Sequence, residues 1–74
     1  MKWIRTLDGE CINLDNIVEL SVTTNDYRHK DKCCVIAVSI NRTYYLWAED
    51  INDCNEENVI YRAEMFIDAL ITST

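Results

Sequence analysis

The chain has 74 residues, of which 49% are hydrophobic and 27% are charged, and this is the composition of one small globular domain covering residues 1–74. Seven basic residues stand against thirteen acidic ones, so the formal net charge is -6. This balance argues against direct nucleic-acid binding, which needs basic charge to neutralise phosphates. No apolar run is long enough to cross a membrane, and no signal peptide opens the chain. We therefore expect a cytoplasmic protein that binds no membrane.

The N-terminal part of the chain predicts short strands. Polar and apolar residues alternate over residues 2–6, and a second strand is expected over 10–14. Asp8-Gly9 predicts the turn between them, because glycine adopts positive φ at little cost. After a corner, alternating residues over 17–24 predict a half-buried strand.

The middle of the chain predicts a hairpin of two stronger strands. Residues 25–31 are polar and are expected to form the loop at its tip. Residues 33–40 are apolar on both faces, which is typical of a buried strand. A turn at Asn41-Arg42 leads to the returning strand over 43–49.

The last part of the chain predicts one amphipathic helix. Asparagine and aspartate residues over 50–55 supply helix N-caps, and Glu56 and Glu57 fall in the first turn. Apolar residues then recur every three or four positions to about Thr72. The predicted fold is α+β: an antiparallel meander of about five short strands, followed by one C-terminal helix packed on one face.

The four cysteines predict buried, reduced thiols, because nothing in the sequence indicates secretion. A zinc site combining Cys11, Cys54 and His29 with one of the adjacent central cysteines is the alternative, although zinc-ligand spacing is absent. We expect no metal and no cofactor. The sequence contains no nucleophile elbow, phosphate loop or dinucleotide fingerprint, so we expect a protein that is not an enzyme.

The central strand is apolar on both sides, but one helix covers one face of a sheet. The uncovered face is expected to carry Val35, Ala37, Tyr45 and Trp47, together with Trp3. Monomers seldom leave such a patch exposed, and tyrosine and tryptophan are favoured at interfaces. We therefore expect a homodimer or a partner complex on this face. The alternative is a sheet that curls and buries both sets of residues itself.

The net charge lies entirely in the C-terminal part of the chain. Residues 1–48 carry equal numbers of acids and bases, whereas residues 49–74 carry seven acids and one base. One interpretation is that these acids stabilise the N-terminus of the helix. The other is an acidic surface that imitates phosphates and blocks the basic groove of a nucleic-acid-binding host protein. The acidic residues are Glu49, Asp50, Asp53, Glu56, Glu57, Glu64 and Asp68.

The opening segments Trp3-Ile4-Arg5-Thr6, Asp8-Gly9 and Ile12-Asn13-Leu14-Asp15-Asn16-Ile17 look like the start of small uncharacterised proteins of Gram-positive bacteria and their phages. The strand at Tyr44–Glu49 leading into an acidic helix is similar to theirs. The resemblance implies a cytoplasmic accessory or phage-encoded protein, and it supplies no catalytic residues. Small acidic phage proteins of this size are sometimes inhibitors of bacterial defence systems, including anti-CRISPR proteins.

Two functions are therefore expected. The first is a non-enzymatic protein-binding module that self-associates through its apolar sheet face. The second is a phage-encoded, anti-CRISPR-like inhibitor of a bacterial defence nuclease that acts through its acidic surface.

Overall fold

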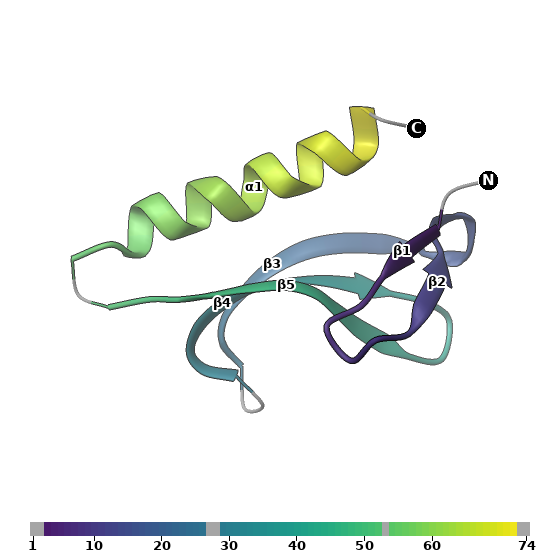
Figure 1. Ribbon diagram of the computed structural model, residues 1–74, viewed down its shortest axis with the longest axis horizontal. Coiled ribbons are helices and arrows are strands. Elements are labelled where there is room, and N and C mark those ends of the chain that lie inside the picture. The colour runs from purple at the N-terminus through teal and green to yellow at the C-terminus, as the bar shows by residue number, and fades with distance from the viewer. Residues whose placement is uncertain (1–2, 27–28, 53, 73–74) are drawn as a thin grey trace.

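The structure, a computed structural model, describes residues 3–26, 29–52 and 54–72. The elements in chain order are β1 (Trp3–Arg5), β2 (Cys11–Asn13), the 3-10 turn η1 (Leu14–Asn16), β3 (Glu19–Asp26), β4 (His29–Val38), β5 (Thr43–Asp50) and α1 (Glu56–Thr72). In Figure 1, α1 lies across one face of a curved sheet, and the β1–β2 hairpin lies at the end of that sheet away from the start of the helix. No helix within these ranges has the length and apolar character needed to span a lipid bilayer.

The α+β class is confirmed, but the single meander is wrong. The five strands form two antiparallel sheets, one of β1 and β2 and one in the order β3-β4-β5. The 3-10 turn separates the two sheets: the Asn13 side chain accepts a hydrogen bond from the backbone N–H of Asp15 at 2.9 Å. The backbone N–H of Leu7 donates to the carbonyl of Tyr45 at 2.8 Å, so the hairpin touches the edge of β5 without joining its sheet.

Strands β3 and β4 extend into the segment that was expected to be a polar loop. Asn25 and Asp31 adopt positive φ angles of 55° and 60°, a conformation that asparagine and aspartate tolerate better than most residues. The side chain of Asn25 accepts a hydrogen bond from the backbone N–H of Asp31 at 3.0 Å. Pairing therefore continues to Asp26 opposite His29.

The predicted helix is confirmed from its first turn to Thr72. The side chains of two asparagines organise its start. The side-chain oxygen of Asn55 accepts a hydrogen bond from the backbone N–H of Asn52 at 2.7 Å, and the side-chain oxygen of Asn52 accepts one from the backbone N–H of Cys54 at 2.9 Å. Glu56 and Glu57 occupy the first turn, where carboxylates complement the helix dipole.

The hydrophobic core lies between α1 and the central strand β4. Cys33, Val35 and Ala37 on β4 have no exposed surface, and neither do Val59 and Ala63 on α1. All five belong to one packed cluster. The helix therefore covers the face of β4 that the sequence analysis expected to remain open.

A bulge in the pairing of β4 with β5 divides the predicted aromatic face. Val35 pairs with Trp47, but the next residue, Ile36, pairs with Tyr45, so Leu46 is an extra residue in β5. Because neighbouring strand residues point to opposite faces, Trp47 and Tyr45 lie on opposite sides of the sheet. Trp47 stacks on Phe66 of α1 with ring centroids 6.3 Å apart, whereas the Tyr45 ring lies 4.6 Å from that of His29.

Candidate functional site

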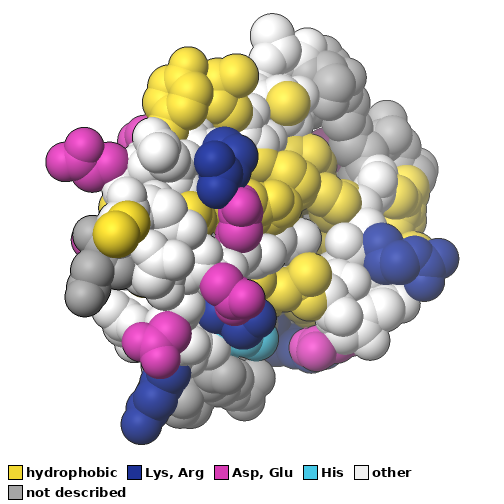
Figure 2. Space-filling view, turned by 60° about the vertical axis from the view of Figure 1, so that its left-hand side comes forward, with side chains coloured by type: hydrophobic (Ala, Val, Ile, Leu, Met, Phe, Trp, Pro, Cys, Tyr) yellow, Lys and Arg dark blue, Asp and Glu magenta, His cyan; other side chains and the backbone are white. Residues whose placement is uncertain are grey.

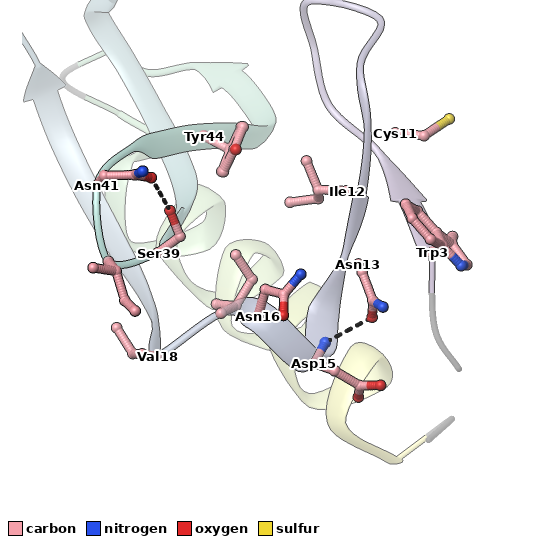
Figure 3. A pocket seen from close by; sticks show the side chains of 12 residues that line it. Trp3, Cys11, Ile12, Asn13, Asp15, Asn16, Val18, Ser39, Asn41 and Tyr44 are labelled. Atoms are coloured by element: carbon pink, nitrogen blue, oxygen red, sulfur yellow. Dashed lines mark hydrogen bonds between the residues drawn. The ribbon is translucent and has the colours of Figure 1, made fainter.

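A groove of about 620 Å³ lies between the β1–β2 hairpin and the turn that joins β4 to β5, and we call it the hairpin groove (Figure 3). Its lining combines aromatic and aliphatic side chains with amides, a hydroxyl, a thiol and a carboxylate. The lining residues are Trp3, Cys11, Ile12, Asn13, Asp15, Asn16, Ile17, Val18, Ser39, Ile40, Asn41 and Tyr44. In Figure 3, Ile12 and Tyr44 lie on facing walls, whereas Trp3 and Cys11 lie on the outer side of the hairpin.

One ion pair joins the two walls of the hairpin groove. Arg42 donates two hydrogen bonds to the carboxylate of Glu10, at 2.9 and 3.2 Å, and this pair connects the β4–β5 turn to the hairpin. The same guanidinium lies 4.8 Å from the centre of the Tyr44 ring. The hydrogen bonds and charge of Glu10 raise the pKa of Arg42 above its usual value. A two-pronged guanidinium–carboxylate contact fixes geometry as well as distance, so the groove has a defined width at this end.

The turns that form the two walls are held by local hydrogen bonds. At the hairpin, Gly9 has a φ of 90° and its N–H donates to the carbonyl of Thr6 at 3.0 Å. At the β4–β5 turn, the hydroxyl of Ser39 donates to the carbonyl of Arg42 at 3.1 Å and accepts from its N–H at 3.2 Å. This closed turn holds Ile40 out in solvent.

Three large apolar side chains of the hairpin groove are exposed. The exposed fractions are 59% for Trp3, 71% for Val18 and 92% for Ile40. Single exposed apolar residues are common, but several around one depression are typical of a binding surface. The amides of Asn13, Asn16 and other lining residues add hydrogen-bonding groups, and this mixture suits recognition of a protein surface.

Few of the side chains that line the hairpin groove are ionisable. Among its lining residues the groove has one carboxylate, that of Asp15, one thiol, that of Cys11, and no histidine, lysine or arginine.

The structure separates the residues predicted for the interface. Trp3 is exposed, as an interface residue requires. The placement of Val35 and Ala37 on an open face is wrong, because α1 packs directly over both. Tyr45 is 8% exposed, and Trp47 is half-buried beside Phe66, so neither presents an open aromatic surface.

The predicted acidic surface is interrupted by bases. Glu49 accepts two hydrogen bonds from Arg62, at 2.6 and 3.0 Å, and Asp50 lies 2.9 Å from Lys32. Arg62 lowers the pKa of Glu49, chiefly through its hydrogen bonds. Figure 2 shows acidic and basic side chains placed together around an apolar centre on one face.

The remaining acids of that set follow the helix. Glu56 and Glu57 occupy its first turn, and Glu64 and Asp68 lie farther along it, all four exposed. Asp53 lies outside the described residues. Of the described members of the set, Glu49 and Asp50 therefore pair with bases, and the four on α1 make no ion pair with another described residue.

Sequence reasoning missed Val18 and Ile40. Both were read as part of alternating strands, whereas Val18 precedes β3 and Ile40 follows β4. The sequence feature that could have indicated the exposure of Ile40 is its position directly before the polar turn residues Asn41-Arg42.

The cysteines divide into two classes rather than one buried set. Cys33 and Cys34 are fully buried, and burial is the main cause of the raised pKa of each thiol. Cys11 and Cys54 are exposed, contrary to expectation. Within the part of the chain that the structure describes, no three histidine, cysteine or acidic side chains converge as metal ligands would.

No protein-family model, curated protein sequence or solved structure matches the chain.

Proposed function

We propose that the protein is a non-enzymatic protein-binding module and that the hairpin groove is its binding surface. The observation that carries the proposal is the exposure of Val18 and Ile40 at one groove of about 620 Å³, with Trp3 exposed on the outer side of the adjoining hairpin. A 74-residue domain has few apolar side chains to spare from its core, so exposed apolar residues at and beside one groove favour a partner that covers them.

The contacts that form the hairpin groove support the same function. The Arg42–Glu10 pair joins the two walls, and local hydrogen bonds close the turn at Ser39 in the free protein. A preformed surface loses less conformational entropy on binding than one that must be ordered.

The nuclease-inhibitor alternative has less support from the charges. Phosphate mimicry requires a run of unneutralised carboxylates, but Glu49 and Asp50 each pair with a base, so among the described residues of the set this run is limited to the carboxylates of α1. Self-association through the sheet face has less support too, because Val35 and Ala37 lie under α1. A second copy at the hairpin groove is one outcome of the experiment below.

Affinity capture with matched variants tests the proposal. The parent protein, Ile40→Glu and Leu7→Glu are immobilised and exposed to a lysate of the source organism and to the purified protein itself. Leu7 is a suitable control because it is 49% exposed and does not line the groove. We expect the parent and Leu7→Glu to retain the same protein, and Ile40→Glu to lose it, since a carboxylate would be buried at the contact.

A further pair of substitutions separates the alternative. Glu56→Gln with Glu57→Gln removes two charges from the acidic set but leaves the hairpin groove unchanged. Retention by this variant supports the groove. Retention by Ile40→Glu together with loss by the double glutamine variant would refute the proposal in favour of acidic mimicry.

A further inference from the structure

A second depression runs along the outer side of β3, between that strand and α1, and we call it the strand groove. It consists of two adjoining hollows of about 390 and 410 Å³ that share Ile67 of the helix. Leu20 and Val22 contribute from β3. Ile17 and Val18 line both the strand groove and the hairpin groove, so the two form one continuous surface.

Strand β3 is an edge strand beside this groove. It has eight residues, Glu19–Asp26, and among the described residues it pairs with β4 alone. Alternate residues of an edge strand direct their N–H and C=O groups outward, where another strand can pair with them. The strand contains neither lysine nor proline, the residues that commonly prevent such pairing.

The side chains along the strand groove are apolar and acidic. Leu20, Val22 and Ile67 are half-buried and provide apolar contact. Glu19, Glu64 and Asp68 are exposed at the margin, and the residues lining the two hollows include no lysine or arginine. None of these three carboxylates makes an ion pair with another described residue.

From these features we infer that the strand groove binds an extended segment of a partner protein as an added strand on β3, with apolar and basic side chains both on the face of the segment that is turned toward α1. The inference rests on the proposed function and names the partner's chemistry. Every second side chain of an added strand points toward α1, the face on which Leu20 and Val22 lie. In this segment the apolar side chains on that face lie against Leu20, Val22 and Ile67, and the basic ones on the same face reach Glu64 and Asp68. This is strand addition, in which backbone hydrogen bonds provide affinity and alternate side chains provide specificity.

The charges disfavour a second copy of this chain as the occupant. A two-fold pairing of β3 with itself would bring together two acidic margins and two chains of net charge -6. Like charges placed across an interface weaken it. A basic segment removes that repulsion.

Nuclear magnetic resonance titration with a defined peptide tests the inference. The probe is acetyl-Val-Thr-Lys-Thr-Val-Thr-Lys-amide, in which the valines and lysines share one face, and its length suits an eight-residue strand. We expect shift changes in the amides of β3 and in Ile67. Glu64→Gln with Asp68→Asn should weaken binding about tenfold, since each exposed charge contributes up to about 1 kcal/mol. Glu56→Gln with Glu57→Gln makes the same change in net charge elsewhere on α1 and should weaken it less than about threefold.

Backbone methylation of the peptide tests strand pairing directly. Alternate amides of a paired strand face β3, and the others face solvent. Methylating one alternate set should abolish binding, and methylating the other set should leave it unchanged. The inference would be overturned if the peptide does not bind, or if methylating either set of amides has the same effect on binding. It would also be overturned if the two double variants weaken binding equally. Such results leave the proposed function intact if Ile40→Glu still loses the captured protein, so the two failures are distinguishable.

Discussion

Replacing Val35 with threonine tests which face of the sheet α1 covers. Val35 lies on the central strand with no exposed surface, packed in one cluster with Val59 and Ala63 of the helix. Threonine has nearly the same shape as valine and an equally good strand propensity. The substitution therefore changes one buried methyl group into a hydroxyl and little else.

The size of the effect follows from that environment. Losing one buried methyl group costs about 0.8 kcal/mol. Burying a hydroxyl without a hydrogen-bond partner costs about 1–3 kcal/mol in addition. The sum is about 2–4 kcal/mol, a large part of the roughly 4–11 kcal/mol expected for a domain of this length. At about 4–8 °C per kcal/mol, the Tm should fall by at least about 8 °C.

Urea denaturation followed by tryptophan fluorescence measures this change, and Val18→Thr provides the matched control. Val18 is 71% exposed, so the same chemical change there should alter the free energy of unfolding by no more than about 0.5 kcal/mol. Equal, small effects at the two sites would refute the packing of α1 over this face. They would restore the open sheet face as a candidate interface.

Three further results are expected. At mildly alkaline pH, a thiol reagent should modify the two exposed cysteines of the native protein quickly. It should modify Cys33 and Cys34 only on unfolding, because burial blocks the reagent and raises the pKa of both thiols. Three or four fast-reacting thiols would contradict this. The pKa of Glu49 is lowered from its usual 4.5, so its pairing with Arg62 stabilises the fold above that pH, and this contribution is lost as the pH falls through the lowered value. Urea denaturation between about pH 5 and pH 3 should therefore show a steeper loss of stability for the parent than for Arg62→Gln; parallel curves would show that the pair contributes nothing. Gly9→Ala should destabilise the fold by about 1–2 kcal/mol in thermal denaturation, because φ is 90° at this position. The space around an added Cβ is open, so this cost comes from the backbone conformation and not from a clash. An unchanged Tm would mean that the turn relaxes at no cost.

The local features of this protein could be predicted from its sequence. The Asp8-Gly9 turn was expected because glycine accepts positive φ, and Gly9 has that conformation. The helix was expected to end near Thr72 because apolar residues recur at helical spacing, and it does. These features depend on neighbouring residues, so the sequence contains the information that sets them.

The candidate surface could be predicted only in part. Trp3 was expected at an interface and is exposed on the hairpin beside the groove, but Val18 and Ile40 were missed. Their exposure depends on where strands end, and strand ends depend on pairing partners that are distant in the sequence.

The choice of covered face was decided by tertiary structure alone. Strand β4 is apolar on both sides, so its sequence pattern is equally compatible with a helix on either face. The helix packs on the face of Val35, where the small side chain of Ala63 permits close approach. The bulge at Leu46 then places Tyr45 and Trp47 on opposite sides, because one extra residue reverses the alternation of a strand. Alternation read from the sequence assumes an unbroken strand, and pairing across the sheet determines where that assumption fails.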